Sequence, residues 1–280
     1  MAVSVLILVK NEEQDLPGCL ASVDWSDDVH LFDSFSTDKT VEIARAAGCV
    51  VTQRKFDNWS DHQNWGLVNI PFKYAWVLYI DADERVSDEL KKTAITAAQS
   101  NAPESAFRLQ RRDYFADGTW LKHAQISPFY LRLFRPEKMR YERLVNPVSI
   151  VDGPVGSVDG YLDHYPFSKG IGFWLERHIK YADLEARTII ENRKKGRDFS
   201  LRDALVSKDL TKRRFHQKEL FYRLPLRPMT KFFYMCVVRR GFMDGRAGIT
   251  YCFLQSIYEY FIVLKERELV SKNKTRKEGK

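Results

Sequence analysis

The sequence predicts an α/β protein in which helices flank a mixed sheet and a mainly helical part follows. Two patterns carry this prediction. In the first part of the chain, short apolar runs rich in β-branched residues alternate with helical stretches, as in parallel βαβ units. From Phe173 onward, apolar residues recur at helical spacing instead. The 280 residues are 44% hydrophobic and 29% charged, as is typical of globular proteins.

The first part of the chain predicts a doubly wound sheet. Val3–Val9 is a near-continuous apolar run, which favours a strand buried on both faces. The acidic residues of Asn11-Glu12-Glu13 favour the start of a helix. The other expected elements are strands at Val29–Phe32, Cys49–Thr52 and Ala75–Ile80, and helices at Val41–Ala47 and Asp61–Val68. Ligands collect at the carboxyl ends of such strands, where Asn11, Asp33 and Asp81 stand.

The later part of the chain changes character. A mixed or antiparallel section is expected, with strands at Ala106–Arg111, Phe129–Phe134 and Val148–Val151. Helices are expected from Phe173 to Ile189 and over Leu220–Val238 and Ala247–Leu264. The predicted organisation is a sheet domain over residues 1–166, a helical, basic and aromatic part over 167–270, and a disordered tail over 271–280.

Charge separates the two main parts. Residues 1–166 carry a net charge of −6 and residues 167–280 one of +14. A basic part of this kind faces nucleic acid, an anionic membrane or an acidic substrate. No nucleic-acid-binding module is recognisable, so no nucleic-acid partner is expected. Aromatic residues alternate with Arg and Lys clusters, which favours an anionic membrane surface over an ordinary packing subdomain.

Localisation follows from the cysteines and the apolar segments. The four cysteines show neither metal-site spacing nor a paired pattern, as in a reducing compartment. Val3–Val9 is too short for a signal sequence, and Ala247–Leu264 is interrupted by Gln255 and Glu259. We therefore expect a cytoplasmic protein that is peripheral at the inner face of the cell membrane, with Glu259 opposing full insertion.

Asp81-Ala82-Asp83 is the strongest chemical signal, because it directly follows a predicted buried strand. Two carboxylates one residue apart at a strand end hold a divalent cation, which in turn bridges the phosphates of a diphosphate. Taken alone, an Asp-x-Asp motif is more often a solvated acidic loop. The neighbouring Asn11 and Asp33 loops favour the metal site.

Several spaced segments together resemble family 2 glycosyltransferases, in particular the lipopolysaccharide-core β-1,4-glucosyltransferase branch. The first three are VSVLILVKNEE, FDSFSTDKT and YIDADERV. The others are His62-Gln63-Asn64, the run Tyr130 to Arg135, Asp163-His164-Tyr165, and the run Arg240 to Arg246. The resemblance covers roughly residues 3 to 267, and it implies a Rossmann-like GT-A fold and inversion at the anomeric carbon.

The resemblance also implies a nucleotide-diphospho-sugar donor, a UDP-sugar above all, bound with Mg²⁺ or Mn²⁺ at Asp81-Ala82-Asp83. Val9, Asn11 and Glu12 would line the base and ribose, with Asp33 accepting from either. Gln63 and Asn64 would face the uridine or the phosphates. Asp83 would be the direct metal ligand, His164 would complete the metal site, and Asp81 would touch ribose or metal.

One segment departs from that branch. A His-Glu pair is expected shortly after the Leu-Arg-Leu-Phe-Arg run, but Leu144-Val145-Asn146-Pro147-Val148 occupies the place. Inversion needs a general base for the acceptor hydroxyl. The candidates are Glu142, Asp113 and Asp152, and Asn146 remains a candidate substrate contact. The departure leaves an inactive chain as an alternative.

The expected function is transfer of a hexose or N-acetylhexosamine to a lipid-linked, lipopolysaccharide or surface-polysaccharide acceptor of a bacterium. A nucleotidyltransferase is one alternative, although it usually has a Gly-rich, basic signature where this chain has Lys10-Asn11-Glu12-Glu13. A non-catalytic nucleotide-sugar-binding protein is the other.

Overall fold

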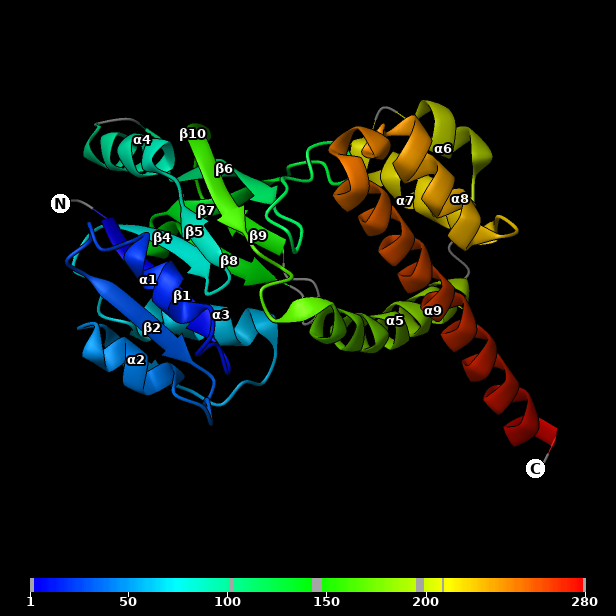
Figure 1. The fold of residues 1–280 in the computed structure, drawn as a ribbon, viewed down its shortest axis with the longest axis horizontal. Coiled ribbons are helices and arrows are strands. Elements are labelled where there is room, and N and C mark those ends of the chain that lie inside the picture. Colours follow the sequence, from blue (N-terminus) through cyan, green and yellow to red (C-terminus); the bar gives the residue numbers. More distant parts are fainter. Residues whose placement is uncertain (1–2, 101–102, 143–147, 195–198, 208, 279–280) are drawn as a thin grey trace. The chain divides into compact units, whose positions relative to one another are not determined.

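The computed structural model describes residues 3–100, 103–142, 148–194, 199–207 and 209–278 (Figure 1). The chain divides into two compact units. The first contains Met1–Trp120 and Ile126–Ser168, and the second contains Leu121–Gln125 and Lys169–Lys280. The expected fold class, a mixed sheet flanked by helices with a mainly helical C-terminal part, is confirmed.

The first unit is built on a mixed sheet. Its strands are β1 (Val3–Val9), β2 (Val29–Asp33), β3 (Val50–Gln53), β4 (Trp76–Asp81), β5 (Glu84–Val86), β6 (Ala106–Asp113), β7 (Phe129–Phe134), β8 (Met139–Glu142), β9 (Val148–Val151) and β10 (Val155–His164). Its helices are α1 (Leu16–Ala21), α2 (Thr40–Ala46), α3 (Trp59–Asn69), α4 (Asp88–Gln99) and the 3₁₀ turn η1 (Pro136–Lys138). In the described residues the main sheet has the order β3-β2-β1-β4-β7-β6-β10-β5, and β8 pairs with β9 alone.

The predicted parallel section is confirmed. Strand β1 pairs in parallel with β2 and β4, and β2 with β3. Strand β7 then reverses, since it is antiparallel to both β4 and β6. This reversal decides where the chain after β7 lies: Phe134 pairs with Val77, close to the amino-terminal end of β4.

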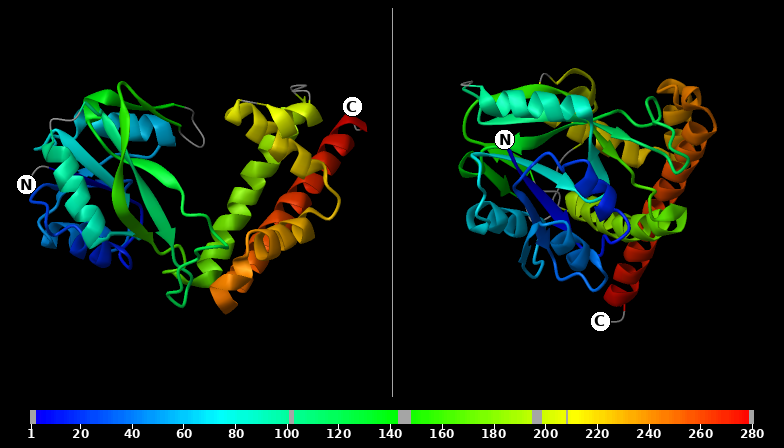
Figure 2. Two further views of the ribbon diagram at one scale, coloured as in Figure 1. Left: turned by 90° about the horizontal axis from the view of Figure 1, so that it is seen from above. Right: turned by 60° about the vertical axis from the view of Figure 1, so that its left-hand side comes forward.

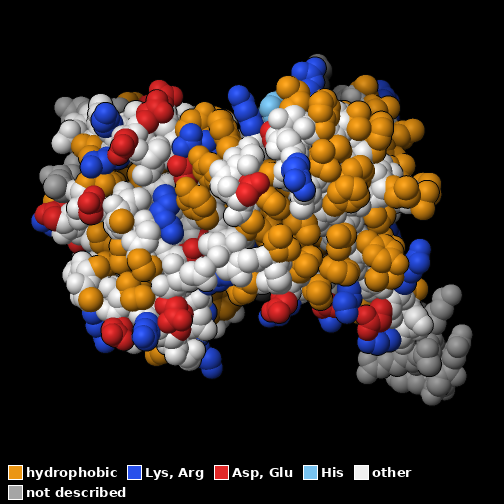
Figure 3. Space-filling view, in the orientation of Figure 1, with side chains coloured by type: hydrophobic (Ala, Val, Ile, Leu, Met, Phe, Trp, Pro, Cys, Tyr) orange, Lys and Arg blue, Asp and Glu red, His pale blue; other side chains and the backbone are white. Residues whose placement is uncertain are grey.

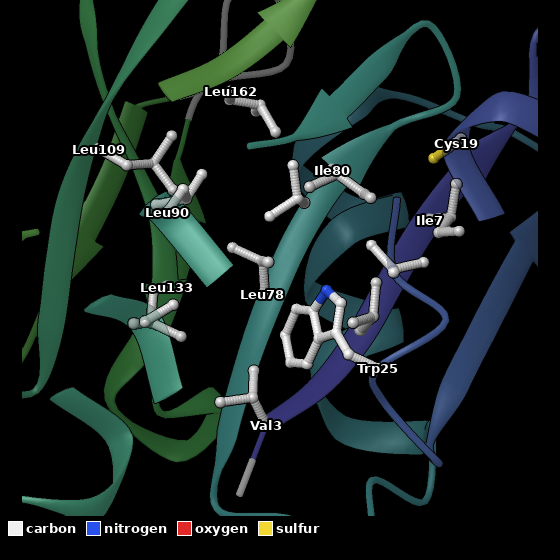
Figure 4. Packing of buried hydrophobic residues seen from close by; sticks show 14 of the residues in the cluster. Val3, Ile7, Cys19, Trp25, Leu78, Ile80, Leu90, Leu109, Leu133 and Leu162 are labelled. Atoms are coloured by element: carbon white, nitrogen blue, oxygen red, sulfur yellow. The ribbon is translucent and has the colours of Figure 1, made fainter. Parts of the chain in front are cut away.

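Both faces of the sheet are covered. One cluster of buried side chains joins alternate residues of β1 and β4, such as Ile7 and Ile80, to α1, α2 and α4 (Figure 4). A second cluster joins the opposite face, including Tyr79, to α3 and to the β8–β9 hairpin. Because both faces of the central strands are buried, these strands are largely apolar, and the polar candidate site residues lie at the strand ends.

The second unit is helical. Its elements are α5 (Gly170–Lys194), α6 (Leu201–Val206), α7 (Leu210–Arg223), α8 (Arg227–Phe233), the π-helical turn η2 (Tyr234–Val238), the 3₁₀ turn η3 (Gly241–Asp244) and α9 (Gly245–Glu278). Helix α5 packs along α9 (Figures 1 and 2), with Ala182 and Ile189 against Ile262. The segment Leu121–Gln125 joins this unit because Asp244 accepts hydrogen bonds from the His123 and Ala124 N–H groups at 2.8 and 2.7 Å.

Two helical predictions need correction. The single helix expected over Leu220–Val238 is broken after Arg223, because Pro225 has no N–H with which to continue it. Helix α9 continues to Glu278, so residues 271–278 are helical rather than part of a disordered tail. Ion pairs from Glu268 to Lys265 and Lys272, three and four residues away, support this solvated end.

A buried ion cluster ties α8 to α9. Arg227 lies 2.6 Å from Glu259 and 2.6 Å from Glu266, and all three side chains are buried. Arg227 therefore lies inside the helical unit. A buried guanidinium needs carboxylate partners, and α9 supplies two of them from one helix face.

Candidate active site

The carboxyl ends of the parallel strands bring the predicted site residues together. The register pairs Val9 with Asp33 and Leu8 with Asp81 across adjacent strands. Asn11 follows β1 at this same edge. The predicted grouping of Asn11, Asp33 and Asp81 is therefore present in the structure.

The loops after β1 and β2 form one hydrogen-bonded assembly. Asn11 has a positive φ of 56°, its N–H donates to Ser36 Oγ at 2.8 Å, and its Oδ1 accepts from the Thr37 N–H at 2.8 Å. The Glu12 N–H donates to Thr40 Oγ1 at 2.8 Å. The helix expected at Asn11 begins only at Leu16, because these polar groups bind the second loop instead. The contacts of Val9, Asn11 and Glu12 with base and ribose stay predictions.

Asp33, the last residue of β2, accepts hydrogen bonds that hold this assembly together. Its carboxylate is fully buried and accepts from the Ser36 N–H at 3.0 Å and from Gln53 Nε2 at 2.8 Å. A contact with the base or ribose requires one of these partners to move aside, and it stays a prediction.

The side chains of Gln63 and Asn64 on α3 have different partners. The Asn64 side chain exchanges two hydrogen bonds of 2.8 Å with the backbone of Tyr141, so its amide acts as a partner for strand β8. A contact of Asn64 with uridine or phosphate would have to break these bonds, and it stays a prediction. Gln63 instead donates to the Tyr79 hydroxyl at 3.5 Å, and its Oε1 is buried without a partner among the described residues. Burial and the nearby Arg54 lower the pKa of His62 to about 4.

Asp81 lies in a buried charge cluster. Arg132 Nη2 donates to Asp81 Oδ2 at 2.7 Å and approaches Glu84 Oε1 at 3.3 Å, while the Tyr79 hydroxyl donates to Asp81 Oδ1 at 2.8 Å. Both Asp81 oxygens thus have hydrogen-bond partners, so direct metal ligation by Asp81 is not supported. The Asp81 side chain is nevertheless 36% exposed to solvent. Ala82 is buried in the core, and its carbonyl accepts from Arg85 at 2.7 Å.

Glu84 is the most perturbed carboxylate of the cluster. It is fully buried and accepts from the Asp81 N–H at 2.9 Å. Burial raises the pKa of Glu84 to about 7, although Arg132 opposes the rise. Arg132 and Arg111 lie next to these carboxylates. Both are largely buried and paired with carboxylates, so they hold the site rather than face a ligand.

Asp83, His164 and Asp113 form a chain of three side chains. Strand β10 places His164 opposite Asp113 on β6 and opposite Glu84 on β5. His164 Nε2 lies 3.3 Å from Asp83 Oδ2, and its Nδ1 contacts Asp113 Oδ1. Burial alone lowers the pKa of His164, but the Asp83 and Asp113 carboxylates outweigh it and raise the pKa to about 9.

These three side chains resemble a partial metal site. Asp83 Oδ2 and His164 Nε2 lie next to each other and could bind the same cation. Asp113 contacts the other ring nitrogen of His164, and a carboxylate behind a ligating histidine is a common arrangement. No group of three such ligands occurs among the described residues. Cations of the Mg²⁺ type complete their shell with water and substrate phosphates, so two protein ligands fit a cation that arrives with a diphosphate.

Two of the three candidate bases are not placed to take a proton from an acceptor. Asp113 is buried behind His164, held also by Arg111 at 3.1 Å, so it positions His164 and does not reach an acceptor. Asp152 pairs with Lys138 at 3.2 Å beside the end of β7, the sheet edge opposite to Asp81, because β7 runs antiparallel to β4. This geometry supports neither assignment, and both stay predictions.

Glu142 stays a prediction. It ends β8, pairs with Arg140 at 3.2 Å and is exposed. Residues alternate in direction along a strand, so Glu142 points away from the face on which Tyr141 packs into the core. Asn146 and most of the segment that replaces the His-Glu pair lie outside the described residues.

A pocket that the sequence did not predict opens beside Asp83. It has a volume of about 400 Å³, and the Tyr165 N–H at its wall donates to the Asp83 carbonyl at 2.9 Å. Its lining includes Asp15, Arg85, Tyr114, Phe115, Tyr165 and Phe167. Tyr114 and Tyr165 stack at 5.1 Å. Aromatic faces with a few charged groups are what a polar, disc-shaped ligand requires. The only sequence signal was the Asp163-His164-Tyr165 segment.

One family model matches more than half of the chain. The family model described as glycosyl transferase family 2 matches residues 4–161. The lipopolysaccharide core biosynthesis glycosyltransferase LpsC of Rhizobium meliloti (strain 1021) is 25% identical over 268 residues, which cover 93% of this chain and 92% of LpsC. An uncharacterized glycosyltransferase of Rickettsia bellii (strain RML369-C) is 36% identical over 90 residues, 32% of this chain and only 30% of that protein. Among solved structures, S. aureus TarS 1-349 in complex with UDP aligns with a TM-score of 0.46 and 13% identity, covering 100% of this chain and 92% of that 1-349 chain.

Proposed function

The chain belongs to glycosyltransferase family 2, and from this premise we propose that it transfers a hexose or N-acetylhexosamine from a UDP-sugar, with inversion, to a bacterial glycan acceptor. The observation that carries the proposal is the pair of Asp83 and His164 at the carboxyl edge of the sheet, beside the loop of Asn11. A diphosphate leaving group needs charge neutralisation at this position.

The residues of the site have distinct roles in this proposal. Asp83 and His164 would hold Mg²⁺ or Mn²⁺, which neutralises charge on the leaving diphosphate. Asp113 fixes the orientation of the His164 ring. Arg132 and Tyr79 hold Asp81 so that its open side faces the ribose. Glu142 is retained as the candidate base.

We assign the acceptor sugar to the pocket lined by Tyr114 and Tyr165. Aromatic faces pack against the apolar side of a pyranose ring, while Arg85 and Asp15 bind hydroxyl or acidic groups. The full-length similarity to LpsC supports a lipopolysaccharide or other lipid-linked acceptor. The reaction would then take place at the inner face of the cell membrane.

The stereochemistry of the product tests the proposal. The protein is incubated with UDP-hexoses and UDP-N-acetylhexosamines, with Mn²⁺ or Mg²⁺, and with deep-rough lipopolysaccharide or polyprenyl-linked sugar as acceptor. We expect UDP release that increases with acceptor and a product whose NMR coupling constant shows the opposite anomeric configuration to the donor. Retained configuration contradicts single displacement. Release of pyrophosphate from a nucleoside triphosphate supports a nucleotidyltransferase instead, and saturable donor binding without turnover supports a non-catalytic protein.

A further inference from the structure

Helix α9 exposes the residues that a helix of a soluble protein normally buries. Five apolar side chains spaced three or four residues apart form one stripe and are 37% to 53% exposed: Ile249, Phe253, Ile257, Tyr260 and Leu264. The opposite side of the same helix buries two carboxylates, Glu259 and Glu266. This distribution is the reverse of the usual amphipathic pattern, in which the polar side faces water.

The preceding elements extend this surface. Six more apolar side chains of α8, η2, η3 and the residue before α8 are 51% to 71% exposed: Leu226, Met229, Phe233, Val238, Phe242 and Met243. Figure 3 shows hydrophobic side chains gathered over the visible face of the helical unit. We call these eleven residues the apolar face. Contiguous apolar surface of this kind marks an interaction site.

Three exposed arginines lie next to residues of the apolar face in the chain. Glu259 was expected to oppose insertion into a bilayer. It is instead buried and bonded to Arg227, so its carboxylate does not face outward. Arg223 ends α7, Arg240 precedes η3 and Arg246 is in the first turn of α9. All three are exposed and form no ion pair with any described residue. Cations at the border of an apolar surface complement the phosphates of lipid headgroups.

We propose that the apolar face inserts among the acyl chains of one leaflet of an anionic lipid bilayer, with these arginines at the headgroups. The segment Gly241–Lys272 is long and apolar enough to span a membrane, but 39% of its most apolar window is buried inside the unit. A helix that packs on one side and is apolar on the other lies in the interface and does not cross it. The proposal concerns lipid binding alone and does not depend on the sugar transfer proposed above.

Salt separates insertion from a purely electrostatic attachment. The full chain is floated with vesicles of phosphatidylcholine and phosphatidylglycerol at about 0.1 M and about 1 M salt, between which the screening length falls from about 10 Å to about 3 Å. We expect binding that weakens at high salt but persists. Complete loss at high salt, or no binding at either, overturns insertion.

Two variants and a matched control locate the surface. Val238→Asp and Met243→Asp each place a carboxylate in the apolar face, and we expect each to lower vesicle partitioning at least about 10-fold, because a charge is costly among acyl chains. Val68→Asp makes the first of these changes at an exposed valine of α3 and should leave partitioning unchanged. Circular dichroism checks that all three variants fold. Equal partitioning of the three overturns the assignment. So does a dimer, measured by sedimentation equilibrium, that Val238→Asp dissociates while vesicle binding is retained.

Discussion

Replacing Asp83 by alanine is expected to lower the rate of sugar transfer by about 10³-fold, since a group that stabilises developing charge contributes several kcal/mol to the transition state. Among the described residues, Asp83 is the carboxylate that lies within 3.3 Å of His164 Nε2, and the variant removes it. The measurement is kcat with saturating UDP-sugar in excess Mn²⁺. The fold should be nearly unaffected, because the Asp83 side chain lies at the partly open edge of the sheet.

Asp24→Ala is the matched control for this effect. Asp24 is exposed in the segment that enters β2, at the sheet edge opposite to the site, and its loss should leave kcat unchanged. Removing the metal with EDTA should reproduce the Asp83→Ala loss in the native protein. Full activity of Asp83→Ala, or of the native protein in EDTA, is incompatible with a metal held at Asp83.

Arg132→Met is expected to destabilise the first unit by about 3–5 kcal/mol, which is the usual cost of leaving buried charge without its partner. The substitution leaves Asp81 and Glu84 without the guanidinium that lies 2.7 and 3.3 Å from them. Urea unfolding gives the free energy of unfolding. Arg108→Met makes the same change at an exposed position of the neighbouring strand β6 and should cost less than about 0.5 kcal/mol.

The cost of Arg132→Met should depend on pH. Glu84 already has its pKa raised to about 7, and loss of Arg132 removes the main opposing charge, so the folded variant binds a proton more readily than the unfolded chain does. Stability of the variant should therefore improve as the pH falls through 7 toward the ordinary glutamate range. The double variant Arg132→Met/Glu84→Gln should recover part of the loss at neutral pH. A pH-independent cost below about 1 kcal/mol speaks against a charge cluster.

Local pattern was sufficient for the elements whose signal is continuous in sequence. Val3–Val9, Phe129–Phe134 and Val148–Val151 are strands with the predicted bounds, because apolar runs between polar loops specify them directly. The short strands β5 and β8 carry no such run and were missed. The predicted helix start at Asn11 failed because the side chains of Asn11 and Glu13 accept hydrogen bonds from the loop after β2, a partner about 25 residues away that local propensity does not include.

The partners within the site could not be predicted from sequence either. Arg132 meets Asp81, and Asp113 meets His164, across separations of 51 residues in both cases. These pairings depend on the strand order and register of the sheet, since β7 lies beside β4 and β10 beside β6. The motif located Asp83 correctly after the end of β4, whereas the bonds from Asn64 to the Tyr141 backbone arise because β8 packs along α3.

The most direct test of the account is whether a nucleotide sugar binds through a metal at Asp83. The melting temperature of the native protein is measured with UDP-sugars, other nucleotide sugars and UDP, each with Mn²⁺ or Mg²⁺ and with EDTA. We expect a UDP-sugar to raise the melting temperature only when metal is present, by an amount equivalent to about 2.7 kcal/mol at one hundred times its Kd. The rise should be absent in Asp83→Ala. A melting temperature that no nucleotide sugar changes, or that rises equally in EDTA, contradicts the account.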